Sequence, residues 1–309
     1  MTAPRACGAG PDAARWPATP DRPSSDRPVS ERVYRATNVL GRAALRLLAV
    51  DTRWTGLEHL PTSGPVILAA NHVSYPDFVL VEQVAVERER YVRFLCRHDV
   101  WNVPLVRTAM DRMQHVPVDR EAPAAAYLKA RRLLRQGDAV GVFPEAGISW
   151  SWTIRSLMPG VASLARETGA PVVPLAIWGS QRLWSVGIPD PRGRKPRPSL
   201  RRRRRVDLSF GEPLAFSAGD DLTGFTRRLG SALTEQLEDL QRLPHHVPTP
   251  GQRAPWHPAH LGGHAPTRDE AAPYDVVPRA AISPTWGPTW GPGRGDEPSG
   301  AAPASPAGS

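Results

Sequence analysis

The amino-acid sequence predicts an α/β fold: a mixed, largely parallel sheet flanked by helices, in a single domain with disordered N- and C-terminal tails. Short apolar runs of strand length alternate with stretches of helical period through the middle of the chain, as in strands joined by covering helices. The composition also changes sharply at both ends, which hold 20 of the 35 prolines and show no apolar period. A central unit at residues 31–243 is a normal size for one domain.

The two ends are expected to stay outside this fold. Residues 1–30 and 244–309 are rich in Pro, Gly, Ala and Ser and have no apolar period. Neither end can bury enough apolar surface to offset the entropy lost on ordering, so we expect disordered tails.

The first helix of the folded unit is expected at residues 31–50. Its apolar positions recur at three- and four-residue spacing, and its arginines fall mostly elsewhere, which is typical of a basic amphipathic helix. Two interpretations are open: the helix lies in a membrane interface with its arginines towards lipid phosphates, or it packs on the core.

The other elements follow from apolar runs and turn residues. Pro174 lies inside an apolar run, which favours an edge strand or a bulge there. Gly137 and Gly169 are expected to end helices. The strands are expected at 65–72, 91–96, 113–118, 139–143, 171–177 and 205–210, and the helices at 77–88, 122–136, 160–168 and 220–242.

Composition excludes several classes of protein. Two cysteines are too few for a disulfide framework or a cysteine-rich zinc site. No run of about 18 apolar residues is present, so no membrane-spanning helix is expected. The first twenty residues lack the pattern of a secretory signal. These observations favour a soluble or membrane-surface protein of a reducing compartment.

The net charge of +9 is concentrated in one segment. Residues 192–205 contain nine cations and no acid, so the basicity forms a patch. Such a patch suits anionic lipid headgroups or phosphorylated ligands, and the alternative is a solvated arginine-rich loop. Nucleic acid is not expected as a partner, because no aromatic side chain interleaves the run to stack on bases.

Histidines gather in the C-terminal tail and raise the question of a metal site. No cysteine or well-placed carboxylate accompanies them in the sequence, so no metal is expected. The histidines are His245, His246, His257, His260 and His264.

The most informative motif is NHVSYPD at residues 71–77. His72 stands where a buried strand ends and Asp77 begins the following helix, and α/β sheets place their ligands at strand C-termini. A carboxylate that bonds one imidazole nitrogen fixes the tautomer and leaves the other nitrogen as a general base. The alternative is a turn histidine beside an aspartate that caps the helix.

Three further blocks follow in order: HVPVDR ending in Arg120, VFPEAGIS at residues 142–149, and VVPLAI at residues 172–177. In this order and spacing, the four blocks resemble those of the glycerophospholipid acyltransferase family, whose best-known member is 1-acylglycerol-3-phosphate acyltransferase. The resemblance spans residues from about 60 to 215 and includes the GEPL turn at residues 211–214.

The resemblance implies transfer of a fatty acyl group from a thioester, acyl-CoA or acyl carrier protein, to a hydroxyl of a lysophospholipid, with 1-acylglycerol-3-phosphate as the expected acceptor and phosphatidate as product. It implies no cofactor and no acyl-enzyme. By position in the motifs, His72 is the general base, Asp77 its orienting carboxylate and Arg120 the ligand of the acceptor's phosphate. Glu145, Gly147 and Asn71 are then expected to form the rest of the acceptor site. A peripheral location on the anionic, cytoplasmic face of the cell membrane follows as an expectation.

The third block departs from the family pattern. Ala146 stands where the family usually has Gly, and Ile148 stands where a basic or amide residue is usual. Arg155 is a candidate for the missing cation. The departure leaves open an acyltransferase with a different acceptor, or a catalytically silent lipid- or acyl-CoA-binding protein on the same scaffold. An esterase that uses the same His–Asp pair on water is a third alternative.

Overall fold

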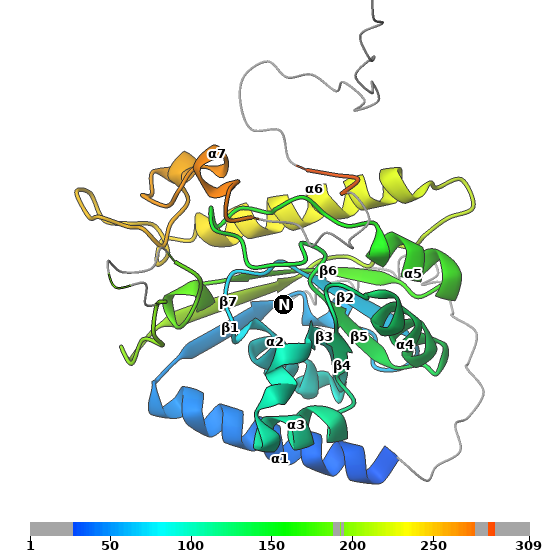
Figure 1. Ribbon diagram of the computed structural model, residues 1–309. Helices are drawn as coiled ribbons and strands as arrows, with labels where there is room; N and C mark the ends of the chain where they lie inside the picture. The colour runs from blue at the N-terminus through cyan, green and yellow to red at the C-terminus, as the bar shows by residue number, and fades with distance from the viewer. Residues whose placement is uncertain (1–26, 188–191, 193–194, 276–283, 288–309) are drawn as a thin grey trace, which may run out of the picture.

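A seven-stranded sheet forms the centre of the protein, in a computed structural model that describes residues 27–187, 192, 195–275 and 284–287 (Figure 1). All neighbouring strands pair in parallel except β6 and β7, so the predicted mixed, largely parallel sheet is confirmed. The strand order is β1-β7-β6-β2-β5-β3-β4. The strands are β1 (Asp51–Thr55), β2 (Val66–Ala70), β3 (Val92–Arg97), β4 (Val116–Val118), β5 (Ala139–Val142), β6 (Val172–Trp178) and β7 (Arg205–Phe210).

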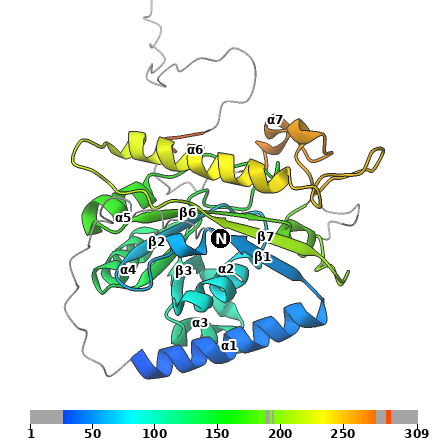
Figure 2. The same cartoon turned by 180° about the vertical axis from the view of Figure 1, so that it is seen from behind.

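Helices cover both faces of this sheet, as Figures 1 and 2 show from opposite sides. Helices α4, α5 and α6 share one hydrophobic cluster with one face of the sheet, and α2 packs in a second cluster on the other face. Helices α1 and α3 lie outside α2, at the bottom of Figure 1. The helices are α1 (Arg27–Leu47), α2 (Asp77–Ala85), α3 (Pro104–Arg112), α4 (Ala124–Arg135), α5 (Gly160–Thr168), α6 (Leu222–Gln241) and α7 (Arg268–Ala271).

The central strands are apolar on both faces because both faces are covered. Every residue of β2 and of β6 is buried. Helix α6 begins at Asp221, whose side chain accepts a hydrogen bond from the backbone N–H of Gly224, and it lays one apolar stripe on the sheet. The sequence predicted the buried strand β2 and the apolar stripe of α6, because a continuous apolar run and a leucine stripe are strong signals.

Within the predicted domain, the strand β1 and the helix α3 were not predicted. The edge strand β1 is half-exposed and reads DTRWT, so it lacks the apolar alternation that marks a strand. In α3, Met110 is the one buried side chain, and the helix covers little of the core.

The predicted disorder of the C-terminal tail is wrong for residues 244–275. This segment folds across the end of the sheet, burying Ala254, His257 and Ala271 to 1% exposure or less. Backbone carbonyls hold it there, since Trp152 Nε1 donates to the Pro255 oxygen at 2.9 Å. Pro and Gly do not prevent order where such bonds satisfy the backbone. Residues 1–26, 276–283 and 288–309 lie outside the described part of the chain.

The prediction of an edge strand at Pro174 is also wrong, because β6 lies between β7 and β2. Residues Leu175 and Phe210 pair, as do Val172 and Leu214. Between those pairs two residues of β6 face three residues, 211–213, so the ladder carries one extra residue opposite Pro174. The alternative of a bulge fits this arrangement, since proline is tolerated where the ladder is interrupted.

The helix predicted at residues 31–50 begins earlier, at Arg27, and ends at Leu47. One side packs on the core: Tyr34 is fully buried and its hydroxyl donates to the Val92 oxygen at 3.3 Å. The other side leaves Leu40 and Leu47 exposed at 71% and 75%. Helix α1 therefore has a core-facing side and an apolar side towards solvent.

Gly141 in β5 offers a test of the packing beneath the motif at residues 71–77. A Cβ on Gly141 would lie 2.4 Å from Phe94 Cε1, and Phe94 stacks on Phe143. We expect Gly141→Ala to lower the free energy of unfolding by about 1–3 kcal/mol, as overpacking does elsewhere. Urea denaturation measures this. Gly160→Ala is the matched control, because a Cβ there meets nothing within 4 Å; equal stability losses in the two variants would contradict the packing.

Candidate active site

The turn between β2 and α2 is built around the carboxylate of Asp77. This side chain is fully buried, at the first position of α2. Its Oδ2 accepts from the backbone N–H groups of Val73 and Ser74, each at 2.8 Å. Its Oδ1 accepts from the hydroxyls of Ser74 and Ser180. A buried carboxylate with this many donors has its lone pairs satisfied and its position fixed.

The same carboxylate orients His72. The His72 Nδ1 lies 3.0 Å from Asp77 Oδ2, and the imidazole stacks on Phe143 with ring centroids 4.0 Å apart and planes 15° apart. An acceptor at Nδ1 requires the proton to be on Nδ1, so the neutral ring carries its lone pair on Nε2. No described residue hydrogen-bonds Nε2, and 19% of the side chain is exposed. The arrangement gives His72 one held nitrogen and one available to a ligand.

Asn71 does not have the predicted geometry of a substrate contact. It is 1% exposed, and its side-chain amide bonds the backbone of Ile177 in both directions, donating at 3.1 Å and accepting at 2.6 Å. The Asn71 side chain therefore ties the end of β2 to β6 and positions the residue that follows it, His72.

Glu145 connects the third motif to the turn that carries His72. Its Oε1 accepts from the backbone N–H of His72 at 2.8 Å, and its Oε2 accepts from the backbone N–H of Arg155 at 2.7 Å. The His72 carbonyl in turn accepts from the backbone N–H of Ser149 at 2.9 Å. Burial raises the pKa of the Glu145 carboxyl to about 8, although the two backbone bonds act against the shift. Glu145 thus holds the backbone of His72 next to that of Arg155 through its two hydrogen bonds.

Two cations converge on Gly147. Arg120 donates from Nη2 to the Ala146 carbonyl at 2.9 Å. A Cβ on Gly147 would lie 2.4 Å from Arg155 Nη1, so glycine leaves room for this guanidinium group, and it would lie at an ordinary contact distance of 3.8 Å from Arg120 Nη2. Burial, and then the neighbouring Arg97 and Arg155, lower the pKa of Arg120. The structure therefore brings Arg120, Gly147 and the candidate Arg155 together.

The altered positions of the third motif have structural consequences. Ala146 has a φ of 55°, in the left-handed region that favours glycine. Ile148 is 8% exposed and packs in a hydrophobic cluster. Arg155, the candidate for the missing cation, is itself buried and reaches Asp275 in the C-terminal segment, with Nη2 donating to the Asp275 carbonyl at 2.5 Å.

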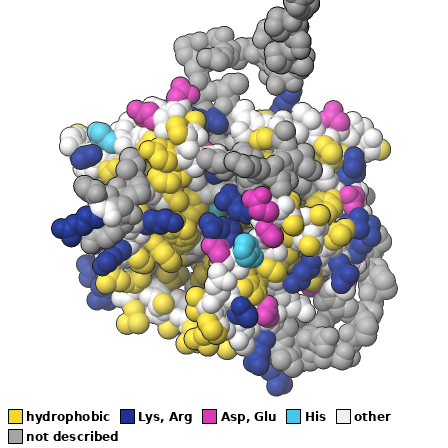
Figure 3. Space-filling model, in the orientation of Figure 1, with side chains coloured by type: hydrophobic (Ala, Val, Ile, Leu, Met, Phe, Trp, Pro, Cys, Tyr) yellow, Lys and Arg dark blue, Asp and Glu magenta, His cyan; other side chains and the backbone are white. Residues whose placement is uncertain are grey.

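Several neighbours of the site gave no signal in the sequence. Ser180 reaches Asp77 from 103 residues away, at 2.7 Å. Trp184 stacks obliquely on Tyr75 at 4.8 Å, and the two exposed rings flank the turn between β2 and α2. A serine after a strand or a pair of distant aromatics is too common in sequences to indicate a site. Figure 3 shows charged side chains gathered near the centre of this face, between hydrophobic areas.

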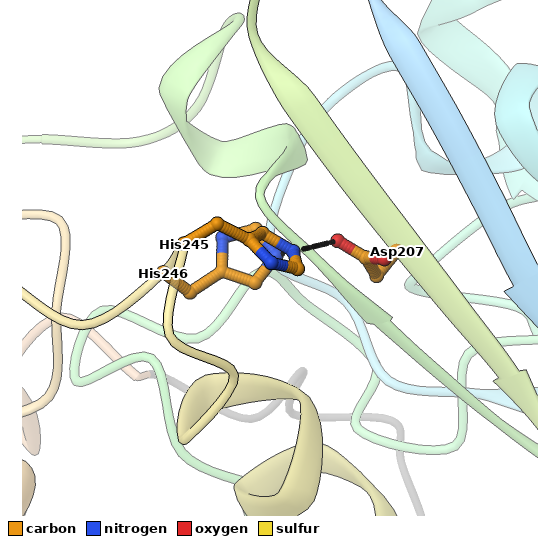
Figure 4. Close-up of side chains that lie close together, drawn as sticks. All are labelled: Asp207, His245 and His246. Carbon is orange, nitrogen blue, oxygen red and sulfur yellow. Dashed lines mark hydrogen bonds and ion pairs between the residues drawn. The ribbon is translucent and has the colours of Figure 1, made fainter.

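The tail histidines meet a carboxylate that the sequence did not indicate. Asp207 of β7 faces both His245 and His246, and Figure 4 shows the two rings side by side and directed at it. The two Nε2 atoms lie 2.7 and 2.8 Å from Asp207 Oδ2, and the three candidate ligand atoms lie within 4.8 Å of one another. Burial raises the pKa of Asp207, but the bonds from His246 and His245 outweigh it and lower the pKa. The cluster is satisfied by its own hydrogen bonds, and the absence of a metal role stays a prediction.

Comparison with known proteins identifies several whose sequences are similar to this chain. Residues 51–178 match the family model described as Acyltransferase. A chloroplastic 1-acyl-sn-glycerol-3-phosphate acyltransferase of Arabidopsis thaliana is 28% identical over 136 residues, which are 43% of this chain and 37% of that protein. The 1-acyl-sn-glycerol-3-phosphate acyltransferase of Borreliella burgdorferi is 25% identical over 151 residues, 48% of this chain and 59% of that one. The chain thus spans 37–59% of the length of these curated relatives.

A solved structure has a similar fold. The crystal structure of the 1-acyl-sn-glycerophosphate acyltransferase PlsC from Thermotoga maritima superposes with a TM-score of 0.56 at 23% identity. The match covers 69% of this chain and 82% of that one. An uncharacterised protein of Mycobacterium tuberculosis is 28% identical over 194 residues, 52% of this chain and 51% of its own length.

The raised pKa of Glu145 predicts a pH-dependent stability. Glu145 holds its proton in the folded state up to a pKa of about 8, against a usual value of 4.5, so the unfolded state releases the proton first as pH rises. The stability contributed by the protonated form is present below pH 4.5 and is lost between about pH 4.5 and 8. Relative to Glu145→Gln, the wild type should therefore become less stable over this range. Urea midpoints of both proteins at pH 5 and pH 8 measure this, and a stability difference independent of pH would refute it.

Proposed function

Since this chain belongs to the glycerophospholipid acyltransferase family through its domain at residues 51–178, we propose that it transfers a fatty acyl group from a thioester to a hydroxyl of a lysophospholipid. The observation that carries the proposal is the His72–Asp77 pair, with Nδ1 held at 3.0 Å and Nε2 available. The acceptor proposed first is 1-acylglycerol-3-phosphate, giving phosphatidate, and the donor is acyl-CoA or acyl carrier protein.

In the proposed reaction, His72 Nε2 takes the proton of the acceptor hydroxyl while the hydroxyl oxygen attacks the thioester carbonyl. The C–O bond forms, the tetrahedral intermediate collapses and the C–S bond breaks. The imidazolium then returns the proton to the leaving thiolate, so the products are an ester and a free thiol. Asp77 stabilises the imidazolium in between, because it is held on the opposite nitrogen.

The acceptor's phosphate is assigned to the region of Gly147. Arg120 supplies a half-buried guanidinium there, and a planar guanidinium fork suits a phosphate group. Arg155 lies beside it, but Asp275 Oδ1 is 3.4 Å from Arg155 Nε and shares its charge. This pairing is the specific observation in favour of the second candidate, an acyltransferase whose acceptor carries less negative charge than lysophosphatidate.

A membrane-facing surface is proposed on α1 and α3. The exposed apolar side chains there include Leu40 on α1 and Leu105 on α3, at 71% and 83% exposure. The two helices lie next to each other at one end of the molecule (Figures 1 and 2). Arg32 and Arg46 on α1 would meet lipid phosphates, whereas Arg42 pairs with Glu87 and Arg35 donates to the Tyr91 hydroxyl. No described helix is long and apolar enough to cross a bilayer. A peripheral position on the cytoplasmic face of the cell membrane is part of this proposal.

Replacing the proposed base tests the chemistry. We expect His72→Ala to keep its fold and to lose at least about 100-fold in kcat/KM, since a positioned acid–base group contributes about 10²–10⁴-fold. The assay measures thiol release from acyl-CoA or acyl carrier protein with 1-acylglycerol-3-phosphate, and lipid analysis separates phosphatidate from the free fatty acid an esterase would form. His260→Ala, at the surface, is the control and should keep wild-type activity. A His72→Ala enzyme as active as this control would end the proposal.

Vesicle flotation tests the membrane-facing surface. We expect the double variant Leu40→Glu, Leu105→Glu to bind vesicles of phosphatidylglycerol and phosphatidylcholine at least about tenfold more weakly, because each leucine buries apolar area worth about 1.5–3 kcal/mol when fully inserted. Leu128→Glu is the control, since Leu128 is 52% exposed on α4, away from this surface. Flotation of the double variant equal to that of Leu128→Glu would mean that another surface binds.

A further inference from the structure

Two arginines beside the catalytic turn have buried atoms that lack partners. The Nε atoms of Arg182 and Arg204 are both buried, and neither has a hydrogen-bond partner among the described residues. Buried polar groups are nearly always bonded, so an unpaired N–H at such a position indicates an absent ligand, ion or water. The Asp207–His245–His246 cluster nearby differs in this respect, because its histidines already bond the carboxylate.

The fold brings these arginines to one place. Arg182 ends the short helical turn Ser180–Arg182 after β6, and Arg204 directly precedes β7. The two segments run side by side, since the Ser199 N–H donates to the Leu183 carbonyl at 2.7 Å. At Gly179 they are so close that a Cβ would lie 2.2 Å from the Arg205 carbonyl oxygen. Arg201 lies in the same basic segment and is exposed.

Within the described part of the chain, no Asp or Glu side chain forms an ion pair with Arg182, Arg204 or Arg201. Arg182 Cζ lies 4.8 Å above the ring of Trp256, which fixes the guanidinium without removing its charge. Burial, and then Arg204 and Arg201, lower the pKa of Arg182 to about 10, and burial and Arg201 lower that of Arg204. The next arginine along, Arg205, shows the usual alternative, since its Nε pairs with Asp51 at 3.1 Å.

We propose that Arg182, Arg204 and Arg201 form a binding site for a phosphate group. Guanidinium donors that converge without a carboxylate match the oxygens of a phosphate monoester or diphosphate. Nothing in the described structure satisfies the two buried Nε atoms in any other way. The nine-cation segment at residues 192–205 is therefore more than a solvated loop at its C-terminal end, where Arg204 is half-buried.

The position of the site relates it to the proposed acyl transfer, on which this part of the inference rests. Ser180, two residues before Arg182, bonds Asp77, and the Tyr75 N–H donates to the Trp184 carbonyl at 3.1 Å. The arginines therefore stand on the loop that borders the catalytic turn, on a different segment from Arg120 and Gly147. A phosphate held there would belong either to the acyl donor or to the headgroup of a membrane lipid beside the acceptor.

Binding of inorganic pyrophosphate to the full-length protein tests the site without any turnover. Titration calorimetry at fixed ionic strength should show that the wild type binds pyrophosphate. The affinity of Arg182→Gln and of Arg204→Gln for pyrophosphate should be at least about tenfold lower. Arg227→Gln is the matched control, because Arg227 is an exposed arginine on α6 and should bind like the wild type. If Arg182→Gln does not fold by circular dichroism, the less buried Arg204→Gln decides alone.

Two further arms identify the source of the phosphate. Weaker coenzyme A binding in the arginine variants supports a site for the acyl donor, and weaker flotation with phosphatidylglycerol vesicles supports a site for a lipid headgroup. Absent pyrophosphate binding, or equal affinity in the wild type, the variants and the control, overturns the proposal. If the protein binds pyrophosphate through these arginines but transfers no acyl group, the phosphate site stands and the proposed function is wrong. If the protein transfers acyl groups but its pyrophosphate binding does not depend on these arginines, the proposed function stands and the phosphate site is wrong.

Discussion

The buried carboxylate of Asp77 is the interaction on which the rest of the site depends. It joins three separate parts of the chain: its own helix α2, the turn at residues 72–74, and Ser180 beyond β6. Because the turn and Ser180 both donate to this carboxylate, they fix its position, and the carboxylate in turn orients His72. Placing the carboxylate at the first turn of a helix adds the favourable field of the helix N-terminus.

The sheet explains why these groups meet. Strands β2, β5 and β6 are parallel neighbours, so their C-terminal ends deliver His72, the third motif and Ser180 to one edge. The C-terminal segment then covers the third motif, where Tyr274 stacks on Trp150 at 4.6 Å and Asp275 meets Arg155. This contact sets how much positive charge Arg155 presents beside Gly147, which connects a region of low-complexity sequence to the chemistry of the site.

Patterns in the sequence predicted the features that depend on residues close together in the chain. The buried strands, the leucine stripe of α6 and the pairing of His72 with Asp77 all follow from neighbours within a few residues. The contacts of Ser180, Asp207 and Asp275 did not follow, since each joins positions that only the folded sheet brings together. The place of Asn71 in the motif predicts a contact with substrate, whereas its amide hydrogen-bonds the backbone of the neighbouring strand β6. Composition alone did not predict the ordered segment at 244–275, because hydrogen bonds between its backbone and the domain cannot be seen in the amino-acid content.

The protonation state of the His72 ring tests the central claim most directly. Nitrogen NMR of the protein labelled with ¹⁵N-histidine distinguishes the two neutral tautomers. The structure predicts that the neutral form of the His72 ring carries its proton on Nδ1 and a lone pair on Nε2, and that this preference is lost in Asp77→Asn, where the carboxylate is gone. A neutral His72 in the wild type that carries its proton on Nε2 would contradict the account, because no base would then face the acceptor hydroxyl.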